Sequence, residues 1–401
     1  MRDGWETVRV SDVATVVGGG TPKSGVETYW GGDVPWLTPK DLSKKPARYT
    51  SSGERSITEE GLKASGARLL PPGSVLLTSR APVGYVTVAS APLATNQGFK
   101  SLVLKDDQVP EFWYYLLGHS TDFLRAHSGG STFAELSGSA LKTLEFTIPP
   151  VLQQRRIVDL IGAVDEAIEA ARDHMAALDE LLLAAQDDIP YAPTSKLGDI
   201  LQGIDSGTSA QAENCPYSAT DKRILKVSAV RPARFYPDES KVVGQIALPE
   251  KGAVREGDLL MTRSNTPDRV GYVCVARDVA QHTYMPDLIW RLRVDESKVS
   301  TKYLEHALSS QRLRRAITAI GTGTSQSMRK INKRGVAGIQ VPMPIASEQA
   351  GYVERAESII RVLRDAQSVR DVLRTLRASL LSALLSGEHR IPEPYDELVG
   401  A

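Results

Sequence analysis

The side chains of this sequence that are best suited to specific binding lie in short glycine-rich turns. They are Arg, Lys, Asn, Gln, Ser and Thr, in both halves of the chain. In the first half the candidates are Thr21, Lys23, Lys40, Arg80, Asn96, Gln97, Ser131 and Thr132; in the second they are Thr208, Arg231, Arg263, Asn265, Arg269, Thr324, Gln326, Arg329 and Lys330. Arg and Lys hydrogen-bond to guanine edges, Asn and Gln to adenine edges, and Ser, Thr and Lys to phosphates. The set predicts loops that contact DNA.

Each of these residues taken alone is also typical of a solvated turn, because Gly, Ser, Asn and Thr favour turns for local reasons. The prediction therefore depends on the recurrence of the whole set in two places. No single member carries it.

The chain contains an internal repeat with a spacing of roughly 190 residues. Residues 8–22, VRVSDVATVVGGGTP, match residues 195–209, SKLGDILQGIDSGTS, so that Gly20-Thr21 faces Gly207-Thr208. The match recurs between residues 72–78 and 256–262, and between residues 83–86 and 270–273. It is weakest at residues 129–133 and 321–326. A sequence pattern that is repeated while its turns differ suggests that the two halves of the chain bind two different half-targets.

The segments between the turns predict an α+β module in each half. Strands are expected at 74–79, 85–89, 100–105, 258–263, 270–276 and 287–294, and one helix in each half near 111–126 and 301–319.

Two long segments have apolar residues at heptad spacing. The expected seam positions are Ile157, Leu160, Val164, Ala167, Ala171, Leu178, Leu181 and Ala185 in the first segment, and Tyr352, Ile359, Val362, Ala366, Val369, Leu373, Leu376, Leu380 and Ala383 in the second. Acidic Asp165, Glu166, Glu169 and Asp173 on the first could face Arg361, Arg364, Arg370 and Arg374 on the second. We expect an antiparallel coiled coil; the alternative is that each helix packs only on its own domain. About 30 helical residues span ~45 Å, compared with ~34–36 Å for one turn of duplex.

These features divide the chain into five predicted parts. The division is recognition domain 1 at 1–150, a central helix at 151–188, recognition domain 2 at 189–346, a C-terminal helix at 347–387 and an acidic tail at 388–401.

The formal net charge is zero, but it is unevenly distributed. Residues 189–346 carry 23 basic and 15 acidic side chains, whereas residues 151–188 carry 3 and 9. Phosphate contacts are therefore plausible in the second half. Two cysteines, no long apolar run and no leader predict a cytoplasmic protein that does not interact with a membrane.

The sequence does not favour an enzyme, and we expect neither a catalytic nor a metal site. Gly18–Gly20 lacks the lysine of a phosphate-binding loop and the spacing of a dinucleotide fingerprint. The histidines show no metal-ligand spacing. Acidic-plus-lysine strings such as Pro286-Asp287 with Glu296-Ser297-Lys298 are too short to indicate a nuclease.

The helix entries carry a family resemblance. Residues 148–158, IPPVLQQRRIV, their weaker echo at residues 344–349, PIASEQ, and the terminal Leu384-Leu385-Ser386-Gly387 resemble the specificity subunit of type I restriction-modification enzymes. The segments that open the two predicted domains, residues 10–21 and 197–208, resemble the same family. The resemblance covers roughly residues 5–392 and departs most at Ala350-Gly351-Tyr352, where a basic-Ile continuation would be expected.

This resemblance implies a non-catalytic reader of double-stranded DNA with a bipartite, asymmetric target. It also implies helices that set the gap between half-sites and dock two modification subunits, which methylate adenine, with restriction subunits as further partners. S-adenosylmethionine, ATP and Mg are then expected on the partners and no cofactor on this chain. The alternative interpretation is a coiled-coil scaffold or decoy that holds methyltransferase subunits without reading sequence.

Overall fold

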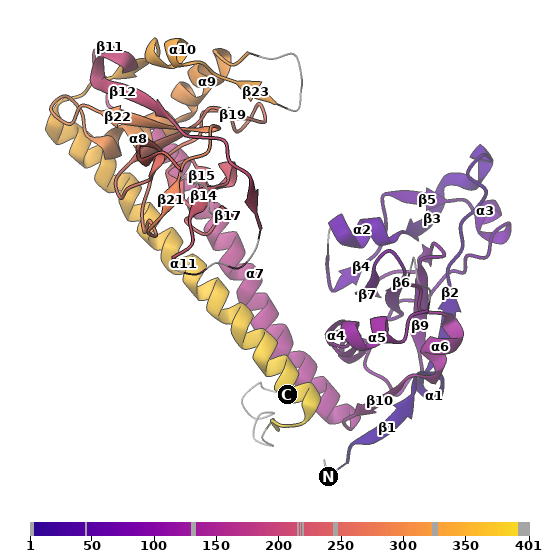
Figure 1. Ribbon diagram of the computed structural model, residues 1–401. Coiled ribbons are helices and arrows are strands. Elements are labelled where there is room, and N and C mark those ends of the chain that lie inside the picture. Colours follow the sequence, from indigo (N-terminus) through magenta and orange to yellow (C-terminus); the bar gives the residue numbers. More distant parts are fainter. Residues whose placement is uncertain are drawn as a thin grey trace. The chain divides into compact units, whose positions relative to one another are not determined.

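The computed structural model of the protein describes residues 4–44, 46–129, 134–214, 216, 218, 220–243, 248–322 and 328–391. The fold has two compact units, residues 1–170 with 370–401 and residues 171–369. Each unit combines one mixed α/β module with part of two long helices (Figure 1). The units are described separately below.

The first module occupies residues 6–148. Its elements are β1 (Glu6–Arg9), α1 (Val10–Val13), β2 (Ala14–Gly18), η1 (Glu27–Tyr29), β3 (Trp30–Leu37), α2 (Pro39–Lys44), β4 (Tyr49–Thr50), β5 (Arg55–Ile57), α3 (Glu59–Lys63), β6 (Val75–Ser79), β7 (Val83–Ala89), β8 (Ala94–Thr95), β9 (Phe99–Leu104), α4 (Pro110–His119), α5 (Thr121–Ala126), α6 (Gly138–Thr143) and β10 (Glu145–Ile148). They form a five-stranded sheet in the order β2-β9-β6-β7-β4, a three-stranded sheet β5-β3-β8 and the pair β1-β10.

The second module occupies residues 194–342. Its elements are β11 (Thr194–Lys196), η2 (Leu197–Ile200), β12 (Leu201–Ser206), β13 (Ala212–Glu213), β14 (Arg223–Leu225), η3 (Val227–Ala229), β15 (Val230–Arg231), β16 (Arg234–Phe235), β17 (Ser240–Val243), η4 (Glu250–Gly252), β18 (Leu259–Thr262), β19 (Ser264–Asn265), β20 (Val273–Val275), β21 (Thr283–Tyr284), β22 (Ile289–Val294), α8 (Thr301–Ser309), α9 (Gln311–Ala319), β23 (Arg329–Lys330), α10 (Lys333–Ala337) and β24 (Gln340–Pro342). Its sheets are β12-β22-β18-β20, β13-β17-β14-β21 and the pairs β11-β24, β15-β16 and β19-β23.

The two modules share one topology. The order β2-β9-β6-β7 in the first equals β12-β22-β18-β20 in the second, and each module is closed by pairing its first strand with its last. Buried threonines also correspond: Thr78 Oγ1 donates to Pro82 O and accepts from Tyr85 N, while Thr262 Oγ1 donates to Arg269 O and accepts from Tyr272 N. The predicted duplication and the α+β fold class are confirmed.

The register of the repeat differs from the sequence match by one residue. A β-bulge between Leu201 and Gly203 adds a residue to β12, so Gly18 pairs with Lys100 as Ser206 pairs with Trp290. Gly19, and not Gly20, therefore corresponds to Gly207. A Cβ would lie 1.9 Å from Asn96 O at Gly19 and 2.1 Å from Pro286 O at Gly207, so only glycine fits at both positions.

The expected strands all exist, but each expected single helix is two helices. In the second module Ser310 is extended, and its side chain accepts from Leu313 N at 3.4 Å, which ends α8 and begins α9. In the first module Ser120, also outside helical geometry, separates α4 from α5. A serine inside an apolar pattern was the available signal for both breaks.

Each module buries one face of its sheet against its helices. In the first, Val75 and Leu77 of β6 pack with Phe112 and Trp113 of α4 in one core. In the second, Met261 of β18 packs with Tyr303 and Leu304 of α8.

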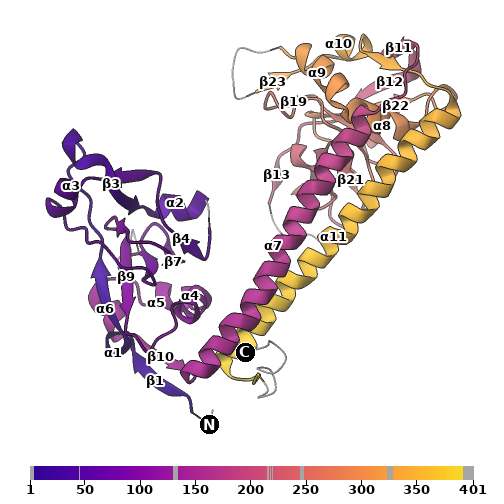
Figure 2. The same ribbon diagram turned by 180° about the vertical axis from the view of Figure 1, so that it is seen from behind.

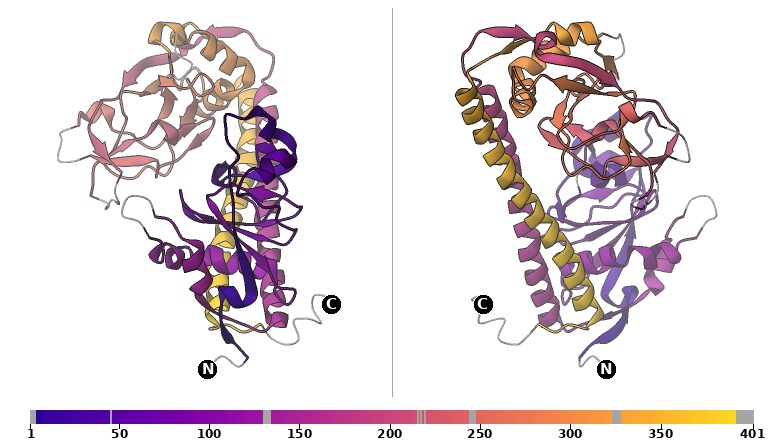
Figure 3. Two further views of the ribbon diagram at one scale, coloured as in Figure 1. Left: turned by 90° about the vertical axis from the view of Figure 1, so that its right-hand side faces the viewer. Right: turned by 60° about the vertical axis from the view of Figure 1, so that its left-hand side comes forward.

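Helix α7 (Val151–Asp187) and helix α11 (Ala346–Ser386) lie side by side in every view (Figures 2 and 3). In the first unit Ile157 and Ile161 share a core with Leu381 and Leu384. In the second, Leu182 packs with Ala356, Ile360 and Leu363. The start of α7 thus meets the end of α11 and the reverse, which confirms the predicted antiparallel pairing.

The expected seam is partly wrong. Leu181, Val362, Val369 and Leu376 were placed in it but are exposed, while Ile161, Leu182, Ala356, Ile360, Leu363 and Leu381 are buried. The reason is that each helix also packs on a module: Ala233 of the second module belongs to the cluster of Leu182 and Ile360. The buried face is therefore rotated toward the modules relative to a two-helix seam.

The expected charge pairing between the helices is also corrected. Asp165 pairs with Arg377, whereas Arg361 pairs with Glu354 and Arg370 with Asp371 on the same helix. In the second unit Arg355 of α11 pairs with Asp188, just after α7.

Both long helices begin with the same hydrogen bond. Gln154 Nε2 donates to Pro149 O at 3.0 Å, and Gln349 Nε2 donates to Pro344 O at 2.9 Å; both glutamines are buried. The weaker second entry motif therefore forms the same local structure as the first.

A polar network fastens the first module to the helices. Tyr115 of α4 donates to Asp165 Oδ2 at 2.8 Å and accepts from Arg48 Nη1 at 2.9 Å, and Arg377 of α11 pairs with the same Asp165. Burial and the bond to Asp165 raise the pKa of Tyr115 well above its usual value, so it stays a donor.

A second network fastens the second module. Arg277 donates to both oxygens of Glu305 at 2.8 and 2.6 Å and to Glu357 Oε1 of α11 at 3.0 Å. His306 of α8 lies 3.3 Å from the same Glu357 oxygen and 3.4 Å from Gln186 of α7. The bond to His306 lowers the pKa of Glu357 to about 2, against the effect of its burial, with Arg277 contributing further.

Substitution of two glycines in the second module should lower the free energy of unfolding by different amounts. Gly271 has φ +71°, and a Cβ there would lie 2.2 Å from Ile317 Cγ2; Gly257 has φ +85° with nothing within 4 Å. Gly257→Ala should cost only backbone strain, ~1–2 kcal/mol, and Gly271→Ala should add ~1–3 kcal/mol of overpacking. Urea unfolding of the two variants measures this difference. Equal losses would contradict the close approach at Gly271.

Candidate nucleic-acid interface

The turns that hold the first set of candidates meet at one edge of the five-stranded sheet. This edge contains the ends of β2 and β6 and the starts of β7 and β9, because these neighbours are antiparallel. Backbone bonds join the turns: Gly20 N donates to Thr95 O at 2.9 Å and Ser79 N donates to Gly98 O at 2.7 Å.

Most of the first-module candidates lie at this edge. Thr21 Oγ1 hydrogen-bonds to Gln97 Oε1, and Asn96 Oδ1 accepts from Gly98 N at 2.8 Å, which leaves the Asn96 amide donors for a ligand. Arg80 follows directly after β6. Lys40 is exposed, next to Pro39, whose ring approaches Gly98. The structure thus brings Thr21, Asn96, Gln97, Arg80 and the loop of Lys40 together.

The segment that carries Lys40 is held by an ordered carboxylate. Asp41 accepts from Thr38 N at 2.7 Å, Thr38 Oγ1 at 2.6 Å and Glu54 N at 3.0 Å. Partial burial raises the pKa of Asp41, but these hydrogen bonds outweigh it and leave the pKa below its usual value. Lys40 therefore lies in the first turn of α2, which these bonds hold in place.

Sequence reasoning missed an aromatic group beside the glycine turn. Trp36 Nε1 donates to Gly20 O at 3.0 Å and Trp30 Nε1 to Lys23 O at 3.3 Å, with the two rings 5.1 Å apart. The Arg55 guanidinium lies 3.6 Å from the centre of the Trp30 ring. Two tryptophans close together in the sequence, Trp30 and Trp36, were the available signal. They fix the backbone that carries Thr21 and Lys23.

The loops expected to differ most between the halves rise from matching stems. The first stem is the bridged pair Gly129 and Glu135, and the second stem is the bridged pair Thr322 and Lys330. The candidates Ser131, Thr132, Thr324 and Gln326 lie outside the described residues.

Four second-module candidates gather around the second stem. Asn265 of β19 pairs with Arg329 of β23, Ser264 pairs with Lys330, and Arg263 immediately precedes this ladder. Arg263 N donates to Leu288 O at 2.9 Å, as Ser79 N does to Gly98 O, so Arg263 takes the place of Ser79. This edge corresponds to that of the first module, and Arg263, Arg329 and Lys330 belong to it.

The other three described candidates of the second module, Thr208, Arg269 and Arg231, lie in separate places. Thr208 N donates to Met285 O at 3.1 Å, which places Thr208 at the same edge. Arg269 is exposed in the turn after β19 and lies 3.4 Å from Asp268. Arg231 lies apart: it stacks on Tyr236 in the β15-β16 hairpin, whose turn residue Ala233 packs on the helices.

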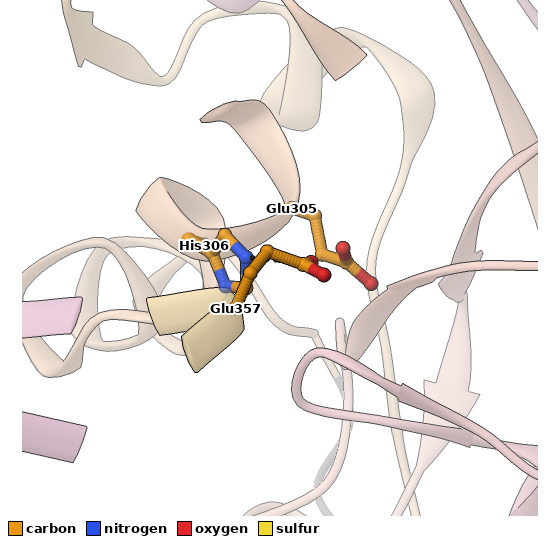
Figure 4. A group of neighbouring side chains, drawn as sticks. All are labelled: Glu305, His306 and Glu357. Carbon is orange, nitrogen blue, oxygen red and sulfur yellow. Dashed lines mark hydrogen bonds and ion pairs between the residues drawn. The ribbon is translucent and has the colours of Figure 1, made fainter. Parts of the chain in front are cut away.

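One side-chain cluster in the described part of the chain has the composition of a metal site. Ligand atoms of Glu305, His306 and Glu357 lie within 4.8 Å of one another (Figure 4). However, Arg277 already bonds to both carboxylates, and Val275 N donates to Glu305 at 2.6 Å. A cation there would displace a paired guanidinium, so the arrangement suits an ion-pair network. Sequence reasoning missed the cluster because Glu357 is 51 residues from His306.

Within the described residues, none of the helices combines the length and the apolar character required to cross a bilayer.

Comparisons with known proteins agree with this architecture. Residues 2–176 match the family model described as type I restriction modification DNA specificity domain. The MjaIX specificity subunit of Methanocaldococcus jannaschii is 44% identical over 181 residues, which cover 45% of this chain and 42% of the relative. The EcoR124I/EcoR124II specificity subunit of Escherichia coli is 29% identical over 169 residues, 40% of each chain. The matched segment thus spans about two fifths of these relatives.

Solved structures extend the likeness of fold over almost the whole chain. A chain from a structure of the assembly and conformational transition of a type I R-M system has a TM-score of 0.60 at 18% identity, covering 96% of this chain and 98% of that one. The S subunit from M. genitalium has a TM-score of 0.52 at 13% identity, covering 95% and 96%. Residues 2–176 are therefore similar to the type I restriction modification DNA specificity domain, and the likeness of fold extends over both modules and both long helices.

Proposed function

We propose that this chain is the non-catalytic, DNA-reading specificity subunit of a type I restriction-modification complex. The observation that carries the proposal is the duplicated module, with one strand order, matching stems and different side chains at the same edge. In this proposal each module reads one half of a split, asymmetric target. Arg80, Asn96 and Gln97 serve the first half, and Arg263, Asn265 and Arg329 the second.

The helix pair is suited to set the gap between the half-sites. Helix α7 has 37 residues and α11 has 41, which correspond to roughly 55 and 60 Å. Both exceed one turn of duplex, about 34–36 Å. Each module is fastened to the pair by a partly or fully buried ion network, so the helices can act as a ruler.

Partner docking is the second part of the proposal. Val362, Val369, Val372 and Leu376 of α11 are exposed, and apolar side chains repeated along one helix are typical of a protein-protein contact. We assign to this surface two modification subunits, which would methylate adenine from S-adenosylmethionine. Restriction subunits, with ATP and Mg, are further partners in the same cytoplasmic complex.

Selection from a random duplex library by the chain assembled with its modification subunits tests the proposal. We expect a motif of two short specified parts with a fixed gap between them, and methylated adenine at that motif in the genome of cells that carry the chain. Binding without enrichment would support the scaffold or decoy alternative, and metal-dependent cleavage by the purified chain would indicate a nuclease.

Arg263 should read a base in the second half-site. Arg263→Ala should cost ~1–3 kcal/mol of affinity for the selected duplex and relax one position of the motif, because a bidentate contact to guanine is lost. Titration of labelled duplex and repeated selection measure both effects.

The matched control is Arg255→Ala. Arg255 belongs to the same module but lies before β18, at the opposite end of the strand that leads to Arg263, and pairs with Glu250. If both variants bound the selected duplex like the wild type, the assignment of Arg263 would be wrong.

A seven-residue insertion in both long helices should lengthen the gap between the half-sites. Seven helical residues add ~10 Å, which is about three base pairs. Selection with this variant should return the same two half-sites with a longer gap, or no binding where the duplex cannot follow. The same insertion in α7 alone breaks the pairing with α11 and serves as the control. An unchanged gap in the double insertion would argue against the ruler.

A further inference from the structure

The two stems carry opposite charges at corresponding positions. Leu136 N donates to Ser79 O and Ile331 N donates to Arg263 O, which aligns the modules residue by residue. Arg80 is bridged to Glu135 as Ser264 is to Lys330. Glu135 of the first stem therefore corresponds to Lys330 of the second, and Arg80 corresponds to Ser264.

Glu135 lies between two cations of the first module. Its Oε2 is 3.6 Å from Arg80 Nη1 and its Oε1 is 3.6 Å from Lys100 Nζ. The side chains are 42%, 37% and 18% exposed for Glu135, Arg80 and Lys100, so Lys100 is largely covered and Arg80 reaches solvent. Glu135 contacts one terminal nitrogen of Arg80, and a guanidinium has five N–H donors, so a free pair remains for a guanine edge.

The second stem has no such acidic group. In the part of the chain that the structure describes, no carboxylate lies within 4.0 Å of the cationic nitrogens of Arg263, Arg329 or Lys330. The position of Lys100 is taken by Trp290, since Gly18 pairs with Lys100 and Ser206 with Trp290. The second edge thus presents unpaired cations where the first presents a triad held by a carboxylate.

We infer, on the basis of the proposed function, that the two modules divide the work of binding. Glu135 is a positioning residue that holds Arg80 for base reading and opposes phosphates, so the first module contributes the larger share of the discrimination between sequences. The second module, with Lys330 at the same place, holds DNA more through charge. A carboxylate near phosphate lowers affinity for every duplex, but an arginine fixed in advance loses less entropy on reaching a base.

The test uses Glu135→Gln in the chain assembled with its modification subunits. Two probes are titrated at several salt concentrations: the duplex that the wild-type complex selects, and mixed genomic fragments. We expect the preference for the selected duplex to fall about 10-fold, with one motif position relaxed. Binding to genomic fragments should strengthen, with a salt slope steeper by about 1 as Arg80 or Lys100 becomes available to a phosphate.

Two control variants separate positioning from simple structure. Glu135→Asp should keep most of the preference, because it retains the charge. Lys330→Gln should weaken both probes equally and make the salt slope shallower by about 1. Thermal melting of each variant checks the fold.

The inference would be wrong if Glu135→Gln weakened both probes equally, left both unchanged, or matched Lys330→Gln in its salt slope. If the wild-type complex selected no sequence, the proposed function would fail instead. The opposite salt slopes of Glu135→Gln and Lys330→Gln on genomic fragments would then still decide the difference between the stems.

Discussion

The attachment of each module to the helix pair is the interaction on which the rest of the structure depends. It is made by a buried polar group on the first helix that follows the main sheet, Tyr115 on α4 or His306 on α8, bonded to a carboxylate on a long helix. An arginine completes each network. Breaking one partner of a buried charge pair leaves the other charge unpaired at a high cost, so these networks favour a single orientation of module on helix.

Each network joins the first helix after the main sheet to a carboxylate on a long helix, but the two are built from different residues. Phenol, carboxylate and two guanidinium groups meet in the first unit, and imidazole, two carboxylates and one guanidinium group in the second. The two modules are therefore fastened to the long helices through corresponding helices but by different side chains. The same holds at the sheet edge that carries the candidate residues, where the backbone bonds of Ser79 and Arg263 agree while their side chains do not.

Much of this architecture could be predicted from the spacing of residues in the sequence. Apolar periodicity and the internal repeat indicate directly which faces of the helices and strands are buried. The residues that resisted prediction depend on tertiary contacts. The extra residue of the β12 bulge displaced Gly20 by one position relative to Gly207, since an alignment without a gap there cannot show a bulge. Val362 and Leu376 obey the heptad rule but are exposed, because the modules cover a different side of α11. Glu135 and Trp36 act through partners that are distant in sequence.

The buried threonines Thr78 and Thr262 have a consequence for how such a protein can change. Each hydroxyl closes the turn that follows it, over seven residues from Thr78 to Tyr85 and over ten from Thr262 to Tyr272. The threonine hydroxyl makes the same two hydrogen bonds in both turns, although the two turns differ in length. Mutations and short insertions inside these turns therefore alter what is presented to a ligand with little loss of folding stability. Under the proposed function, target preference can then change through a series of folded intermediates, because the turns can vary while the strands and helices stay the same.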